Sequence, residues 1–302
     1  MASSMKRFSI KNKLLLIFGL LVLAATTLLG VFATNIARKA VTEKVEAHLM
    51  GKADDTAEII VGKVNSLFQF MQGIARMPVF TDETISFSDK MASLQNEVNF
   101  NRTLHEAVIT DAAGFMYTKT GEKISVQNSE WYRSALSGKN FMSEPQESLT
   151  DKRLILTVAV PIYNEQRQVV NVLAANVDGL WLTEQIKDIV VGQTGSVYIV
   201  GTSGTTIADP DPDTVTSMWN STKAAESDNR LKPLAEIEQK VLNSKQAIFG
   251  TYYYKGVVKI SAGKAMNNGW AVIVFAPYKE FMGTVSALRA SLLGIGIVIV
   301  LV

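Results

Sequence analysis

Residues suited to metal binding are few in this chain and lie far apart. Asp209, Asp211 and Asp213 alternate with two prolines, and alternating carboxylates occur in calcium-binding loops. The segment has neither the glycine at the sixth loop position nor the acidic residue at the twelfth that an EF-hand uses, so we interpret it as an exposed turn. The two histidines, His48 and His105, belong to no His-Glu-x-x-His motif, so the sequence does not predict catalytic zinc.

Residues suited to covalent catalysis are equally sparse. The chain has no cysteine, which excludes thiol nucleophiles, disulfides and thiolate metal sites. The segment Gly201-Thr-Ser-Gly204 places its serine one position away from the nucleophile-elbow pattern, and we predict a turn between two strands there. No nucleophile, base and orienting residue stand at a recognised spacing. The sequence therefore predicts a protein that is not an enzyme and needs no cofactor or metal.

Three residues are better suited to binding a small molecule. Trp131 and Tyr132 form an aromatic pair, which can attract a cation through its ring faces or stack on a planar base. Asp178 follows an apolar strand predicted over residues 172–177, and its carboxylate can accept hydrogen bonds from an amine or a ring N–H. Both features have structural alternatives: the aromatic pair can pack in a core, and Asp178 can cap a helix predicted over 180–190.

Two apolar stretches decide where such a site would lie. Residues 14–33 carry no charge and are long enough to cross a bilayer as a helix. Lys6, Arg7, Lys11 and Lys13 precede this stretch, which favours a cytoplasmic N-terminus. Residues 290–302 are again wholly apolar but too short to cross alone. We predict a cytoplasmic segment 1–13, a transmembrane helix 14–34, an extracytoplasmic region 35–286 and the truncated start of a second transmembrane helix, 287–302.

The charge balance argues against nucleic acid as a partner. All 28 acidic residues but only 25 of the 30 basic residues lie between the two apolar stretches, which leaves a formal charge of −3 there. A protein that binds nucleic acid needs a basic face to neutralise phosphates. The pI near 8.6 therefore reflects the basic residues beside the membrane.

The extracytoplasmic region is predicted to be α+β. Apolar residues recur at steps of three and four from residue 35 to about residue 76, which indicates one long helix that Pro78 ends. β-rich segments then alternate with turns in two modules, 79–180 and 181–286. Predicted strands cover 104–110, 115–118, 154–163, 169–177, 196–200, 205–208, 247–255, 257–266 and 270–276; predicted helices cover 130–137, 180–190 and 223–242.

Several short segments, in this order, resemble one family of sensor domains. They are Val108-Ile-Thr-Asp-Ala-Ala-Gly114, Trp131-Tyr132-Arg-Ser-Ala-Leu, Val158-Ala-Val-Pro-Ile-Tyr163, Ala174-Ala-Asn-Val-Asp178-Gly-Leu, Gly192-Gln-Thr-Gly-Ser-Val-Tyr-Ile-Val200, Asn268-Gly-Trp270-Ala-Val-Ile-Val and Pro277-Tyr-Lys-Glu-Phe281. Together they resemble the double Cache domains of bacterial transmembrane receptors, above all methyl-accepting chemotaxis proteins. The resemblance implies a long helix and two PAS-like antiparallel-sheet modules flanked by two transmembrane helices, with the ligand in the membrane-distal module.

The resemblance also implies a ligand site. In the amino-acid-binding branch, an arginine two residues before the Trp-aromatic pair holds the ligand carboxylate, and an aspartate after the last distal strand holds the ammonium. Trp131, Tyr132 and Asp178 occupy matching positions, but Ser129 stands at the arginine position and cannot supply a bidentate charged clamp. We therefore expect an amine or a nucleobase-like ligand rather than an ordinary amino acid. Further candidate contacts are Tyr117, Asn128, Ser143, Asp151 and Tyr163.

The predicted function is that of a chemoreceptor sensor region in the bacterial inner membrane, which binds a small metabolite and signals mechanically across the bilayer. Dimerisation along residues 35–76 is expected, and the cytoplasmic signalling module lies outside this chain. A histidine kinase or cyclic-dinucleotide enzyme is an alternative owner of the same sensor. A membrane-anchored envelope hydrolase and a structural ectodomain are alternatives of other classes.

Overall fold

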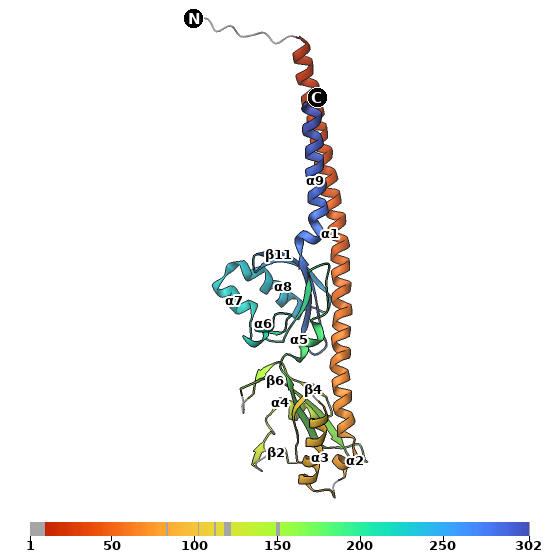
Figure 1. The fold of residues 1–302 in the computed structure, drawn as a ribbon, viewed down its shortest axis with the longest axis vertical. Coiled ribbons are helices and arrows are strands. Elements are labelled where there is room, and N and C mark those ends of the chain that lie inside the picture. Colours follow the sequence, from red (N-terminus) through yellow and green to blue (C-terminus); the bar gives the residue numbers. More distant parts are fainter. Residues whose placement is uncertain are drawn as a thin grey trace.

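A single helix runs along most of the length of the molecule (Figure 1). The computed structural model describes residues 10–82, 84–101, 103–111, 113–117, 122–148 and 152–301. Helix α1 (Ile10–Ala75) has 66 residues, and two α+β modules lie one after the other along it. Helix α9 (Tyr278–Leu301) returns beside the N-terminal half of α1, and Arg38 Nη2 donates a hydrogen bond to Tyr278 Oη at 3.4 Å. The predicted continuous helix is thus confirmed.

One face of α1 contributes a stripe of buried side chains to the hydrophobic core. Its buried apolar residues follow one another at steps of three and four, as a helix that buries one face requires; they are Val45, Leu49, Ala53, Ala57, Ile60, Val64, Leu67, Met71 and Ile74. Ile36, an apolar residue at the start of the predicted helix 35–76, is 68% exposed because the modules begin beyond it. The short helix α2 (Pro78–Thr81) starts at the proline predicted to end the long helix.

The distal module is a five-stranded antiparallel sheet in the order β1-β7-β6-β4, with β5 also paired to β6. The strands are β1 (Leu104–Ile109), β4 (Phe141–Met142), β5 (Gln146–Glu147), β6 (Leu154–Tyr163) and β7 (Val169–Asp178). Leu156, Val158 and Leu173 are fully buried on the sheet face that shares the core of α1. Helix α3 (Phe87–Phe100) packs beside β1, and Ser86 caps it through Asp89 N.

The opposite face of the distal sheet is covered differently. Helix α4 (Glu130–Leu136) packs on β6 and β7, and a hairpin of β2 (Phe115–Tyr117) and β3 (Lys123–Ser125) forms a separate two-stranded sheet. Side chains alternate between the two faces of a strand, so the face under α4 carries Thr157 and Ala159 of β6 and Val172, Ala174 and Asn176 of β7.

The proximal module repeats this plan with a sheet in the order β10-β11-β12-β8-β9. Its strands are β8 (Ser196–Val200), β9 (Thr206–Ala208), β10 (Ile248–Tyr254), β11 (Val257–Ala265) and β12 (Ala271–Pro277); α5 (Trp181–Ile186) and α6 (Pro212–Thr216) are short helices. Ile260 and Val274 face the core of α1, whereas Tyr198, Tyr252 and Ile273 pack in a second cluster on the other face. The antiparallel α+β architecture agrees with the sequence prediction.

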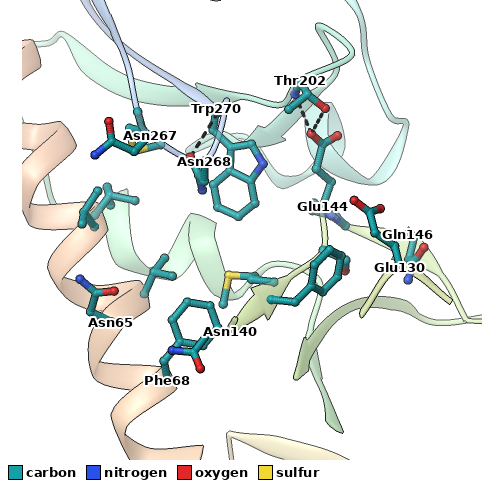
Figure 2. Close-up of a pocket in the computed structure, with 18 residues that line it drawn as sticks. Asn65, Phe68, Glu130, Asn140, Glu144, Gln146, Thr202, Asn267, Asn268 and Trp270 are labelled. Atoms are coloured by element: carbon teal, nitrogen blue, oxygen red, sulfur yellow. Dashed lines mark hydrogen bonds between the residues drawn. The ribbon is translucent and has the colours of Figure 1, made fainter. Parts of the chain in front are cut away.

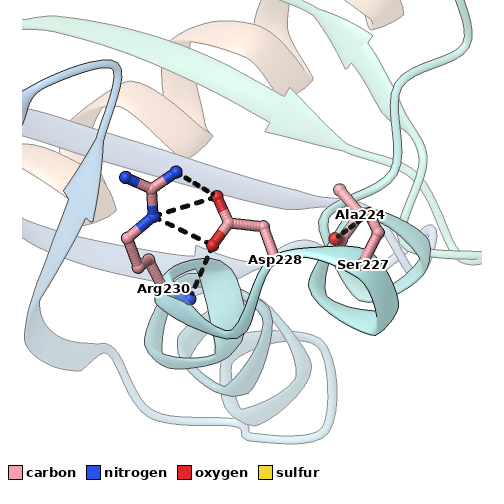
Figure 3. A network of polar contacts seen from close by, with 4 residues as sticks. All are labelled: Ala224, Ser227, Asp228 and Arg230. Carbon is pink, nitrogen blue, oxygen red and sulfur yellow. Dashed lines mark hydrogen bonds and ion pairs between the residues drawn. The ribbon is translucent and has the colours of Figure 1, made fainter.

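The helix predicted over residues 223–242 is interrupted, which corrects that prediction. The segment forms α7 (Ser221–Ser227), the 3₁₀ turn η1 (Asn229–Leu231) and α8 (Lys232–Leu242). The Asp228 carboxylate accepts hydrogen bonds from Arg230 N at 3.0 Å and from the Arg230 guanidinium at 2.8 Å, which starts a new turn (Figure 3). Pro233 at the start of α8 suits a first helical turn, where no backbone donor is needed.

One described helix is long and apolar enough to cross a membrane by length and composition, and its apolar part lies near the N-terminus of α1. The second predicted span, within α9, stays a prediction. Asp211 caps α6 by accepting a hydrogen bond from Asp213 N, so the Asp209–Asp213 segment is a turn that enters a short helix. Gly201–Gly204 is the predicted turn between β8 and β9, closed by Gly204 N on the Gly201 carbonyl.

Candidate ligand-binding site

The sheet face under α4, here called the distal outer face, gathers polar groups at one end. Strand register pairs Ile155 with Asp178, Thr157 with Asn176 and Ala159 with Ala174. Thr157 Oγ1 donates to Asn176 Oδ1 at 3.2 Å, and Gln146 Nε2 donates to Thr157 Oγ1 at 3.4 Å. These bonds form a polar row across the end of the sheet nearest the proximal module.

The aromatic pair divides between packing and exposure. Tyr132 is 5% exposed and packs with Ala159 and Ala174. Burial raises the pKa of its phenol, and the Asp111 carboxylate adds to the rise. Trp131 is half-buried, and its ring meets the Tyr132 ring edge to face with centroids 6.1 Å apart. Tyr132 therefore belongs to the module's core, whereas Trp131 keeps surface to offer a ligand.

Asp178 lies at the exposed end of β7, and its Oδ1 accepts a hydrogen bond from Leu180 N at 2.8 Å. This bond orients the backbone just before α5, which resembles the helix-capping role that the sequence left open for Asp178. Asn176 lies two residues earlier on the same face of the sheet, the distal outer face, and its side chain is half-buried. We did not single it out from the sequence. Alternation along the predicted strand would have placed residues 174, 176 and 178 together.

The remaining predicted residues spread over the module. Ser129 is half-buried at the N-terminal end of α4, where its side chain makes no capping bond, and Asn128 is exposed beside it. Tyr117 Oη donates to Asp111 Oδ2 at 3.2 Å, and its ring centroid lies 4.7 Å from that of Phe87.

One of the predicted contacts, Tyr163, lies away from the polar row. Tyr163 Oη donates to the Gly138 carbonyl at 3.4 Å, and Tyr163 lies eight positions along β6 from Ile155, roughly 27 Å of strand. A small ligand cannot contact both Tyr163 and the Asn176 end. Asp151 lies outside the described residues. Ser143 Oγ accepts a hydrogen bond from Thr157 N at 2.8 Å, which ties the segment after β4 to the same end of the sheet.

A larger hollow, here called the seam cavity, lies between the two modules and α1 (Figure 2). Its volume is about 890 Å³. Residues of α1, of the segment around β4 and β5, and of the turn between β11 and β12 line it, and Glu130, the first residue of α4, does so too. Among the described residues predicted for the ligand site, Ser143 lines this cavity and the others do not. Segments that are distant in sequence come together to form it, so no local sequence pattern predicts it.

At the edge of the seam cavity, one carboxylate joins the modules. Glu144 Oε1 accepts hydrogen bonds from Thr202 N at 2.6 Å and from Thr202 Oγ1 at 2.8 Å (Figure 2). Gly201 permits this approach, because a Cβ at that position would lie 2.5 Å from the Glu144 carboxylate. The segment after β4 in the distal module therefore contacts the β8–β9 turn of the proximal module directly.

The proximal module holds a buried acid that we did not predict. Glu238 on α8 is 1% exposed, and its carboxylate accepts hydrogen bonds from Tyr198 Oη at 3.0 Å and from the Ser221 hydroxyl. Burial raises the pKa of Glu238 to about 7 and lowers the pKa of nearby Lys259 to about 8. Among the described residues, no group of three or more metal-ligating side chains occurs, there or elsewhere.

Comparisons with known proteins relate this architecture to sensor domains. A family model described as Cache domain, dCache_1, matches residues 33–285. No curated protein sequence matches the chain.

Solved structures with a similar fold include the ligand-binding domains of two chemoreceptors, one of them in two complexes. That of the Pseudomonas fluorescens chemoreceptor CtaA in complex with L-isoleucine is 18% identical, with a TM-score of 0.61 and coverage of 82% of this chain and 98% of that one. The CtaA complex with L-serine is 16% identical, with a TM-score of 0.57 and coverage of 78% and 98%. That of the Campylobacter jejuni chemoreceptor Tlp3 in complex with 4-methylisoleucine is 10% identical, with a TM-score of 0.59 and coverage of 80% and 94%.

Proposed function

The chain belongs to the Cache domain family, and we propose that it is the extracytoplasmic sensor region of a bacterial transmembrane chemoreceptor that binds a small metabolite on the distal outer face. The observation that carries the proposal is the polar row of Asn176, Thr157 and Gln146, on the sheet face that α1 does not occupy. A face built only for packing would carry apolar side chains there, as the opposite face does.

The ligand carries an amino group or a ring N–H donor. Asn176 Oδ1 and the Asp178 carboxylate are acceptors at the polar end of the face, and Trp131 supplies an aromatic surface for a cation or a planar ring. The structural relatives CtaA and Tlp3 bind amino acids, which share the ammonium group and set the size of the ligand. Ser129 offers no guanidinium to a carboxylate, so amines and nucleobases are expected to bind ahead of free amino acids.

Signalling follows from the connections of the two modules. The distal module ends at Asp178 and passes into the proximal module, whose last strand, β12, continues into α9. α9 lies beside α1, so a ligand that favours one arrangement of the modules changes the relation of these two helices. We propose that both helices enter the inner membrane, that residues 35–76 support a homodimer, and that a signalling module follows residue 302.

Thermal-shift screening of residues 35–286 against amines, nucleobases and amino acids tests the proposal, because a ligand that binds only the folded form raises Tm. Asn176→Leu is expected to abolish the shift. Asn99→Leu, on the exposed surface of α3 in the same module, is the matched control and should keep it. An amino acid that binds at micromolar strength would refute the argument from Ser129. Turnover of any compound would favour the envelope hydrolase instead.

A further inference from the structure

We propose that the seam cavity is a second binding site beside the distal outer face, with which it shares Gln146, and that it takes a linear diamine or polyamine. At about 890 Å³ its volume falls within the range of small-molecule sites, which are often found where domains meet.

The charge of the lining selects a cation. Glu130 and Glu144 are the charged residues among those described in the lining, which includes no lysine, arginine or histidine. Glu130 has no hydrogen-bond or ion-pair partner among the described residues. Glu144 uses only Oε1 for both bonds to Thr202, which leaves Oε2 available. An anionic ligand would meet two carboxylates without a counter-charge, and a neutral polyol would leave both carboxylates without a charged partner.

The uncharged lining suits a ligand with several ammonium groups on an aliphatic chain. Five carboxamides surround the cavity, and each carboxamide oxygen can accept a hydrogen bond from an ammonium; they are Asn65, Asn140, Gln146, Asn267 and Asn268. Asn65 on α1 and Asn267 in the β11–β12 turn make no side-chain hydrogen bond to another described residue. Figure 2 shows both side chains on the side of α1, one above the other, with Glu130 and Glu144 on the opposite side, so ammonium groups at the two ends of one ligand find acceptors on both sides.

Apolar side chains provide a surface for the methylene groups between the amines. Phe68, Phe141 and Met142 are half-buried around the cavity, and Ile60 and Val64 form buried wall on α1. Aromatic faces also attract ammonium groups. A polyamine bound here would contact α1 and both modules at once, beside the Glu144–Thr202 link, and would restrain their relative position.

Isothermal titration of the full 302-residue chain in detergent with putrescine and spermidine tests the proposal. We expect binding that weakens as NaCl is raised, since it depends on charge. Glu130→Gln and Glu144→Gln should each weaken spermidine binding roughly tenfold, about 1.4 kcal/mol. Glutamine at position 144 still accepts the Thr202 bonds, so the link between modules is retained. Glu226→Gln, on the exposed side of α7, is the matched control and should bind like the parent chain.

The distal variant Asn176→Leu separates this site from the proposed sensor site. Polyamine binding that survives Asn176→Leu and is weakened by both glutamine variants supports the seam cavity. Binding that Asn176→Leu abolishes and the glutamine variants leave intact assigns the amine to the distal outer face, which would overturn this proposal and support the sensor function. Absence of binding up to millimolar spermidine also overturns the seam proposal, and leaves the thermal-shift test of the sensor function unaffected.

Discussion

Replacing Glu238 by glutamine is expected to remove a pH-dependent loss of stability from the proximal module. The Glu238 side chain is 1% exposed, and burial raises its pKa from 4.5 to about 7. A group with a raised folded-state pKa stabilises the fold fully below its unfolded pKa, and this contribution is lost as pH rises through the folded pKa. The window is therefore pH 4.5 to 7. At about 1.4 kcal/mol per pKa unit the whole effect is roughly 3 kcal/mol, of which about 2.5 kcal/mol falls between pH 5 and pH 8.

Urea unfolding of residues 35–286 at pH 5 and pH 8 measures this effect. The parent fragment should lose about 2.5 kcal/mol more of its unfolding free energy between the two pH values than Glu238→Gln does. Glu236→Gln, two residues earlier on the exposed side of α8, is the matched control and should retain the parent behaviour. The reasoning fails if Glu238→Gln keeps the full pH dependence of the parent, or if Glu236→Gln removes it as well.

Three further changes test the packing. Gly201→Val places a side chain where the Glu144 carboxylate lies, and should cost about 2 kcal/mol of unfolding free energy. In a double-mutant cycle, the variant that carries both Gly201→Val and Glu144→Ala should lose no more unfolding free energy than Gly201→Val alone. Leu156→Ala, on the fully buried face of β6, should cost about 2–5 kcal/mol in urea unfolding, whereas Tyr163→Ala, 39% exposed, should cost under about 1 kcal/mol and leave ligand binding unchanged. Asp228→Ala removes the cap of η1 and should lower stability by about 1 kcal/mol by the same measurement; an unchanged value would contradict the role of that cap.

The long elements could be predicted from the sequence because each shows one period over many residues. The predicted strand 154–163 coincides with β6, and Val169–Asp178 extends its prediction by one residue. β3, β4 and β5 have two or three residues each, too few for any period to show. The predicted helix 223–242 is longer than the helices observed in that segment, because the apolar pattern does not identify Asp228 as a cap that ends one turn and begins the next.

The candidate site was harder to predict because it depends on contacts between distant segments. Asp178 drew attention as a charged residue after a strand, while the neutral Asn176 on the same face did not. Glu238 had a signal that was missed: it lies four residues after Leu234 and three before Val241, so a carboxylate interrupts the buried stripe of α8. Nothing local could show that Glu144 meets Thr202, because the two modules create that contact.

The most direct test of the sensor account uses the four tryptophans as site markers. Trp131 lies on the distal outer face, Trp270 lines the seam cavity, Trp219 lies in the proximal module and Trp181 begins α5. Residues 35–286 labelled with 5-fluorotryptophan are titrated by ¹⁹F NMR with the compound that raises Tm, and the Trp131 signal is assigned with Trp131→Phe. The account predicts that the Trp131 resonance shifts first and most strongly. A titration that shifts Trp219 and leaves Trp131 unchanged would contradict it.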